Sequence, residues 1–241
     1  MKQGRIFAVN MIFFVFFIAA LCLMYFIPNS STRLKRAQDS YAENGESDID
    51  NKWAYFLINE EFPLPDGYEP ELSLVQGTFM MDERCARYAR DMIAAAKEDG
   101  VDLCVVSAYR SIQKQQENLD AYTERLIKEG MSEDEARKAA LFEIAEPGTS
   151  EHNAGLSLDI LTYDWWENHD DVTADFENTE EYLWLYSNAH KYGFILRYPK
   201  EWENVTGYTY EPWHYRFVGV YYANLIRESG LPFEYYYKTN F

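Results

Sequence analysis

The sequence predicts an α+β fold, in which a small, mainly antiparallel sheet is flanked by helices and preceded by a single N-terminal transmembrane helix. Three observations lead to this prediction. Hydrophobic residues make up 47% of the 241 residues, which is ample for one packed domain. Short β-branched runs and amphipathic segments follow one another without a repeating strand–helix–strand order. A long apolar run stands near the N-terminus.

The apolar run extends from Ile6 to Ile27 and contains Asn10 as its only strongly polar residue. At about 1.5 Å per residue, a helix of this length crosses a hydrocarbon core of about 30 Å. A cleavable secretory signal is the alternative, but its apolar core is typically only about 7–15 residues long. We therefore predict an uncleaved signal anchor over residues 1–28. Basic residues flank both of its ends, so charge alone does not decide its orientation.

Residues 29–50 are polar and contain almost no apolar side chains, so they cannot bury enough surface to offset their ordering entropy. We predict a flexible linker here and a folded domain over residues 51–241. Lys2 and Arg5 are the only charged residues before the linker, so the rest of the chain carries 20 Lys and Arg against 40 Asp and Glu. This balance argues against nucleic acid as a partner, because phosphate recognition depends on clustered cations.

The first half of the domain shows clear start and stop signals. Residues 53–81 are mixed in character, and the three prolines of the segment FPLPDGYEPEL indicate an extended lead-in rather than a helix. A helix is predicted from the capping residue Asp82 to Gly100, followed by a buried strand over residues 101–109. Two further helices are predicted, one over residues 111–129 and one that starts at the Ser-x-x-Glu capping box of SEDEARKAALFEIA.

The second half mixes strands and helices. The alternation in residues 156–161 predicts a strand, and residues 208–216 are typical of one or two short strands. Helices are predicted over residues 179–192, which end before Gly193, and over residues 218–228.

The two cysteines of the domain, Cys85 and Cys104, leave two possibilities. They could form a disulfide if the domain is extracellular, or they could be buried free thiols. We favour two thiols, and neither a zinc ribbon nor a disulfide framework can be built from so few cysteines.

Two of the four histidines are in settings that suit catalysis. His169 lies in a polar loop and His190 in the last turn of a predicted helix, so we assign them structural or surface roles. His152 precedes a strand that places Asp159 on the face opposite the core, and His214 belongs to the segment YEPWHYRF.

A glutamate precedes the last histidine by three residues, at Glu211. Two histidines and one carboxylate match the ligands of a catalytic zinc that leaves a fourth position for water, and a nearby free glutamate is the expected general base. The pair His152 and Asp159 and the pair Glu211 and His214 are each weak evidence for a zinc site when taken alone, because such pairs often occur by chance.

Three segments together are much more specific: SAYRSIQKQQ, PGTSEHNAGLSLDI and YEPWHYRFVG. In this order they resemble the signature blocks of the VanY-type D-alanyl-D-alanine carboxypeptidases, within the lysostaphin-like and D-Ala-D-Ala metallopeptidases. The resemblance implies a domain with one Zn²⁺ ion in a cleft. Ala108 stands where glycine is frequent and Ser157 where alanine is frequent, which leaves the metal geometry intact but the finer preference of the pocket open.

The resemblance also assigns roles to individual residues. It implies that His152, Asp159 and His214 bind zinc, that Glu211 is the catalytic base, and that Arg110 contacts substrate and stabilises the oxyanion. The predicted substrate-binding residues are Ser107, Gln115, Ser150 and Trp213. Which of these groups meets the terminal carboxylate of the substrate stays open.

The function implied is removal of the terminal D-alanine from peptidoglycan stem peptides, at either a D-Ala-D-Ala or an L,D bond. Because these peptides lie outside the bacterial membrane, we expect a single-pass membrane protein with an extracellular catalytic domain. A non-catalytic zinc module that binds peptidoglycan and a cell-wall endopeptidase are the alternatives. The oligomeric state is left open.

Overall fold

The computed structural model describes residues 53–168 and 172–240. The predicted anchor, the predicted linker and His169 lie outside these ranges. Within them, no helix is both long enough and apolar enough to cross a membrane.

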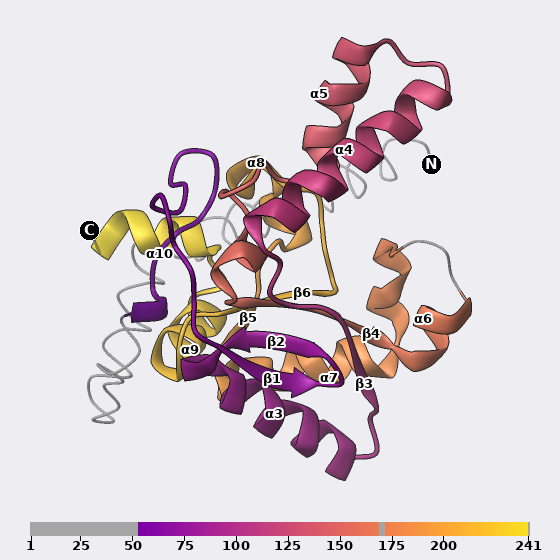
Figure 1. Cartoon of the computed structure of the whole chain (residues 1–241). Helices are drawn as coiled ribbons and strands as arrows, with labels where there is room; N and C mark the ends of the chain where they lie inside the picture. Colours follow the sequence, from indigo (N-terminus) through magenta and orange to yellow (C-terminus); the bar gives the residue numbers. More distant parts are fainter. Residues whose placement is uncertain (1–52, 169–171, 241) are drawn as a thin grey trace, which may run out of the picture.

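The described chain forms two small antiparallel sheets and a set of helices (Figure 1). The strands are β1 (Leu72–Gln76), β2 (Phe79–Asp82), β3 (Leu103–Ser107), β4 (Ser157–Thr162), β5 (Phe194–Leu196) and β6 (His214–Phe217). The α-helices are α3 (Glu83–Glu98), α4 (Ile112–Lys128), α5 (Glu133–Glu143), α6 (Tyr163–Asn168), α7 (Glu180–Asn188), α8 (Glu203–Thr206), α9 (Val220–Ser229) and α10 (Phe233–Asn240). Short 3₁₀ helices are η2 (Glu151–Ala154), η3 (Ala174–Asn178), η4 (Ala189–Tyr192) and η5 (Lys200–Trp202).

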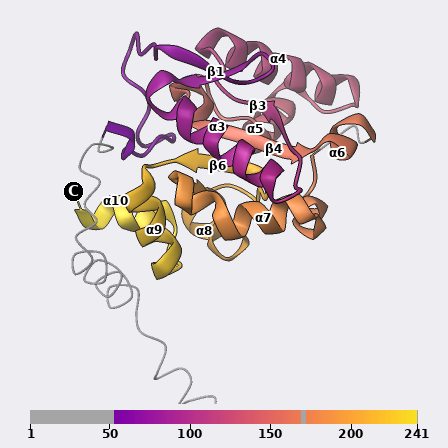
Figure 2. The same ribbon diagram turned by 90° about the horizontal axis from the view of Figure 1, so that it is seen from below.

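The larger sheet has the strand order β3-β4-β6-β5, and β1 and β2 form a separate hairpin. Helices α3 and α7 lie on one side of the larger sheet, and the α4–α5 hairpin projects away on the other side (Figures 1 and 2). This arrangement confirms the predicted α+β fold with a small antiparallel sheet flanked by helices.

Alternation along β4 separates the core from the site. Leu158 and Ile160 are fully buried and pack with Met92 of α3 in the main hydrophobic cluster. Successive side chains of a strand point to opposite faces, so Ser157 and Asp159 point away from this core. One face of the sheet therefore supplies stability, and the other is left for polar side chains.

Several local predictions are confirmed. Asp82 caps α3 through the backbone N–H of Arg84, and Ser132 and Glu135 form the predicted capping box of α5. Cys85 and Cys104 are both buried and free, as favoured from the sequence.

Other local predictions are wrong. Residues 72–82 form the β1–β2 hairpin, which was not predicted, and Gly77 takes the positive φ of 57° that its tight turn needs. The predicted helix over residues 179–192 is divided into α7 and η4. The strand predicted over residues 208–216 begins only at His214 and continues to Phe217. Strand β5 and helices α6, α8 and α10 were not predicted.

Candidate active site

Strand register places three polar residues side by side across the sheet. Ser107 on β3 is paired with Asp159 on β4, and Asp159 is paired with His214 on β6. Directly opposed residues in antiparallel strands have Cβ atoms about 4.5–5.5 Å apart. Residues separated by some 50 positions in the sequence are thus brought into contact by the sheet.

His152 reaches the same place from the turn η2. Ser150 caps this turn by accepting a hydrogen bond from the backbone N–H of His152, and Gly155 ends it with a φ of 68°. A Cβ at Gly155 would lie 2.9 Å from the backbone nitrogen of Asp82, so the close approach of the two segments also requires glycine. The turn thereby directs His152 toward the paired residues on β4 and β6.

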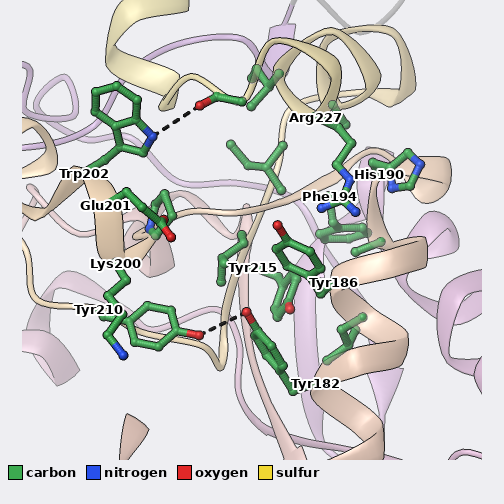
Figure 3. Close-up of a pocket in the computed structure, with 18 of the residues that line it drawn as sticks. Tyr182, Tyr186, His190, Phe194, Lys200, Glu201, Trp202, Tyr210, Tyr215 and Arg227 are labelled. Carbon is green, nitrogen blue, oxygen red and sulfur yellow. Dashed lines mark hydrogen bonds between the residues drawn. The ribbon is translucent and has the colours of Figure 1, made fainter. Parts of the chain in front are cut away.

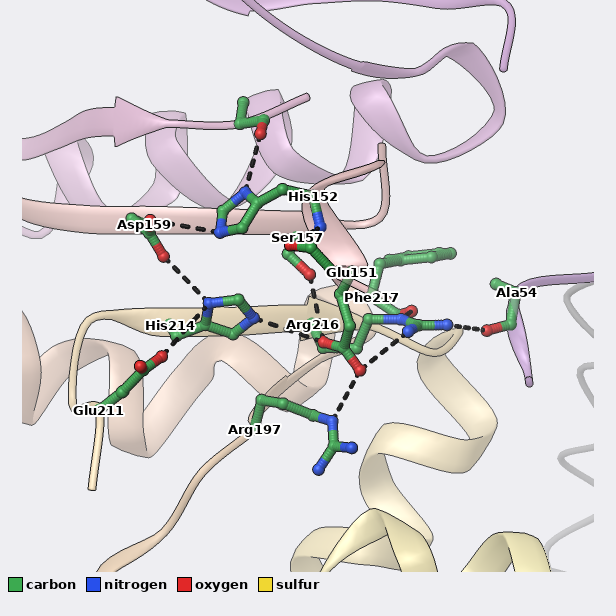
Figure 4. Close-up of polar contacts among 12 residues, drawn as sticks. Ala54, Glu151, His152, Ser157, Asp159, Arg197, Glu211, His214, Arg216 and Phe217 are labelled. Atoms are coloured by element: carbon green, nitrogen blue, oxygen red, sulfur yellow. Dashed lines mark hydrogen bonds and ion pairs between the residues drawn. The ribbon is translucent and has the colours of Figure 1, made fainter. Parts of the chain in front are cut away.

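The side chains of His152, Asp159 and His214 form a compact group whose potential ligand atoms all lie within 4.8 Å of one another (Figure 4). His152 Nε2 lies 3.3 Å from Asp159 Oδ2, and His214 Nδ1 lies 3.1 Å from Asp159 Oδ1. Ligand atoms about 2.0–2.1 Å from a tetrahedral zinc are roughly 3.3 Å from each other. The group therefore fits a zinc ion.

Two further details fit a cation. His152 Nδ1 lies 2.8 Å from the carbonyl oxygen of Ala108, so Nδ1 carries the proton and Nε2 presents its lone pair to the centre. Asp159 Oδ1 is buried, and within the described ranges its one close polar neighbour is Nδ1 of His214, another residue of the same group, at 3.1 Å. A buried carboxylate oxygen in this condition is a natural metal ligand.

Glu211 lies beside the group but outside the ligand triangle. Its Oε2 is 3.6 Å from His214 Nδ1, and 20% of its side chain is exposed. Burial raises the pKa of Glu211 to about 7, although His214 partly opposes this rise. A carboxylate with a pKa near neutrality that is not needed as a ligand can act as a general base.

Arg110 is held in place by two of the predicted substrate-binding residues. Its Nη1 donates to Oε1 of Gln115 at 2.9 Å, and its Nη2 donates to Oγ of Ser107 at 3.0 Å. Gln115 is only 1% exposed and also donates to the carbonyl of Ala145, so its polar groups are already in use. The structure thus places Ser107 and Gln115 as supports of Arg110.

The other two predicted substrate-binding residues also have structural contacts. Ser150 caps η2, as described above. Trp213 packs partly buried against the main core cluster, and its carbonyl oxygen accepts a hydrogen bond from Ile160. Direct contact of these residues with substrate stays a prediction.

Sequence reasoning missed Glu151, which lies between Ser150 and His152 in the chain. Its side chain is fully buried and forms ion pairs with two buried arginines, Arg197 and Arg216. Burial opposes its ionisation, but these two guanidinium groups hold the pKa of Glu151 well below its usual range. A charged residue directly before a ligand histidine, together with arginines next to apolar residues of β5 and β6, was the signal available in the sequence.

The charges of the cluster are strongly coupled. Burial would raise the pKa of Asp159, but His152 and His214 outweigh it and hold this pKa well below its ordinary value. Burial would lower the pKa of His214, yet its interactions with Asp159 and Glu151 raise it to about 10. In the metal-free protein, His214 is therefore an imidazolium between two carboxylates.

This coupling predicts that the free energy of unfolding of the metal-free protein falls from about pH 7 to about pH 9. The folded pKa of His214 is about 10 against an ordinary 6.5, so over this range the folded state keeps a proton that the unfolded chain has lost. The stabilisation is complete below about pH 6.5 and is lost at up to about 1.4 kcal/mol per pH unit. Urea denaturation of the metal-free protein at several pH values measures it. His214→Gln should flatten the dependence, and equal slopes in both proteins would contradict the prediction.

A separate cavity of about 250 Å³ lies between α7, α9 and the other face of β5 and β6 (Figure 3). Its lining is rich in aromatic residues and includes Tyr182, Tyr210 and Tyr215. Tyr215 follows His214 on β6, so the two side chains point to opposite faces of the sheet. None of the predicted site residues is among those that line this cavity in the described part of the chain.

The chain is similar to known proteins in both sequence and structure. A family model described as VanY, D-alanyl-D-alanine carboxypeptidase, matches residues 78–220 and so includes all three sequence blocks. A D-alanyl-D-alanine carboxypeptidase of Enterococcus faecalis (strain ATCC 700802 / V583) is 36% identical over 202 residues, which cover 84% of this chain and 72% of that protein.

Solved structures are similar as well. VanYB in complex with D-alanine-D-alanine has a TM-score of 0.69 and 37% identity, and the match covers 78% of this chain and 99% of that one. A variant of the vancomycin-resistance D,D-pentapeptidase VanY in complex with Zn(II) has a TM-score of 0.66 and 38% identity. This match covers 76% of this chain and 98% of that one. The LD-carboxypeptidase LdcB has a TM-score of 0.66 and 32% identity, with 80% and 92% covered.

Proposed function

Since the chain belongs to the VanY family of D-alanyl-D-alanine carboxypeptidases, we propose that it is a zinc-dependent carboxypeptidase that releases the terminal D-alanine of peptidoglycan stem peptides. The observation that carries this proposal is the convergence of His152, Asp159 and His214, with Glu211 left free beside them. The structure of VanY with Zn(II) supports zinc as the metal.

His152 Nε2, His214 Nδ1 and a carboxylate oxygen of Asp159 would hold one zinc ion. When bound, zinc supplies Lewis acidity, which polarises the scissile carbonyl and makes water a better nucleophile. Glu211 takes the proton of the attacking water on a carboxylate oxygen and then delivers it to the amine of the departing D-alanine. The partial burial of Glu211 favours this exchange, because a base with a pKa near 7 both accepts and returns a proton readily.

Arg110 is proposed to donate to the oxygen that becomes negative in the transition state. Its guanidinium is fixed by Ser107 and Gln115, so little reorganisation is needed when the charge develops. Its backbone N–H donates to the carbonyl of His152 at 3.0 Å, which ties the arginine segment to a ligand of the metal. Removal of a preorganised donor of this kind typically lowers turnover by about 10²–10³.

The proposal is tested with the purified domain and two synthetic stem peptides, a pentapeptide ending in D-Ala-D-Ala and a tetrapeptide ending in an L,D bond. We expect one D-alanine to be released from the pentapeptide, in proportion to the zinc content, as measured by mass spectrometry. The similarity to LdcB favours the L,D tetrapeptide as the second candidate substrate. Inertness toward both peptides at full zinc occupancy would refute the carboxypeptidase proposal, and cleavage inside cross-linked peptides would indicate an endopeptidase.

We also propose that residues 1–28 anchor the enzyme in the bacterial membrane, and that residues 29–50 link the anchor to an extracellular domain formed by residues 51–241. The 22-residue apolar run and the extracellular position of stem peptides support this arrangement. Recovery of the full chain in the membrane fraction, with the domain open to protease added outside the cell, checks it.

A further inference from the structure

We infer that Glu151 is a positioning residue of the metal centre, whose buried carboxylate fixes the orientation and tautomer of His214. This inference rests on the proposed function, because it concerns one of the three proposed zinc ligands. The inference gives a role to Glu151, a residue to which the sequence analysis assigned none.

The carboxylate of Glu151 lies between a ligand histidine and two guanidinium groups (Figure 4). Its Oε2 is 3.4 Å from Nε2 of His214 and accepts a hydrogen bond from Oγ of Ser157 at 3.2 Å. Its Oε1 accepts from Nε of Arg197 at 2.7 Å and forms an ion pair with Nη1 of Arg216 at 3.0 Å. The two oxygens therefore have different partners, and one of them faces the imidazole.

This contact selects one tautomer of His214. A neutral imidazole carries its proton on one nitrogen and presents a lone pair on the other, and an ionised carboxylate can only accept a hydrogen bond. In the neutral imidazole that a metal requires, Nε2 lies against Glu151 and keeps the proton, so Nδ1 is the nitrogen whose lone pair is free for the proposed metal position. Metal-binding histidines commonly depend on such an outer partner.

The surroundings of Glu151 keep it ionised. Arg197 is 1% exposed and Arg216 is 0% exposed, so both positive charges are withdrawn from water. Arg197 also donates to Glu234, and Arg216 also donates to the carbonyl oxygen of Ala54. A buried charge network seldom adds stability beyond that of apolar packing, so a function in specifying the neighbouring site is a reasonable explanation for it.

Glu151→Gln tests the inference, because glutamine has the same size but only one acceptor oxygen. The guanidinium groups of Arg197 and Arg216 are donors only, so they compete for that oxygen and turn the amide NH₂ toward Nε2 of His214. Two donors then face each other when Nδ1 is free to bind metal. We expect the affinity for zinc to fall by about 10–100-fold, the range typical when an outer partner of a ligand histidine is lost.

The matched control is Glu234→Gln, which alters the second carboxylate that binds Arg197 without touching His214. Zinc affinity is measured for each full-length protein by competition with a chromophoric chelator, and the thermal unfolding of each metal-free protein is recorded alongside. We expect both variants to unfold at lower temperature but only Glu151→Gln to lose zinc affinity. An equal loss of affinity in both, or no loss in Glu151→Gln, would overturn the inference.

If Glu151→Gln does not fold, the inference is tested by comparing Arg197→Gln with a double variant in which the two buried charges are removed together. Arg197→Gln alone keeps Glu151 between Arg216 and His214, whereas Glu151→Gln with Arg197→Gln removes one charge of each sign. The double variant should bind zinc about 10–100-fold more weakly than Arg197→Gln. Equal affinities would refute the positioning role while wild-type hydrolysis still stood, and a wild-type protein that bound no zinc would instead refute the proposed function.

Discussion

His152→Ala is expected to abolish both stoichiometric zinc binding and D-alanine release. A catalytic zinc needs three protein ligands, and the other ionisable side chain of the turn η2, Glu151, is held by Arg197 and Arg216. Metal analysis after gel filtration measures zinc per chain, and mass spectrometry of the pentapeptide measures hydrolysis. Zinc should fall from about one ion per chain to a trace in the variant.

His190→Ala is the matched control, because His190 is a partly buried histidine that lines the separate cavity of Figure 3. We expect this variant to keep its zinc and its activity. Full zinc occupancy in His152→Ala would remove His152 from the ligand set, and a loss of zinc in both variants would show that the effect is one of general stability.

Glu211→Gln is expected to retain zinc and lose about 10²–10⁴ in kcat, which is the usual contribution of a general base. The amide keeps the shape of the side chain but has no carboxylate to accept a proton from water. Because Glu211 lies outside the triangle of ligand atoms, zinc affinity should stay close to that of the wild type. Parallel measurements of zinc content and peptide hydrolysis separate the two effects.

Glu143→Gln serves as the control for the charge change. Glu143 is an exposed residue at the end of α5, and its negative charge contributes to the raised pKa of Glu211. Its replacement should leave kcat within a small factor of the wild-type value. Unchanged turnover in Glu211→Gln would show that another group accepts the proton.

The sequence was most informative where the functional residues lie close together along the chain. Gly155, the spacing of His152 and Asp159, and the pair Glu211 and His214 all lie in short blocks, and the structure brings these side chains together as expected. Caps such as Asp82 were also predictable, because one side chain and one nearby backbone N–H decide them.

The sequence was least informative where a contact joins distant segments. The contacts of Glu151 in the turn η2 depend on Arg197, which is 46 residues away in the sequence, and on Arg216 of strand β6. No periodicity links these positions, and an arginine in an apolar strand can equally well face water. Strand β5 escaped prediction because three residues are too few to show alternation.

The row formed by Ser107, Asp159 and His214 has a consequence for folding. A shift of one residue in the pairing of β4 with β6 would turn Leu158 to the place of Asp159 and expose apolar side chains to water. The metal site thus comes into being only when strands from distant parts of the chain have aligned correctly. The rate of zinc uptake during refolding should therefore report how fast the sheet is completed.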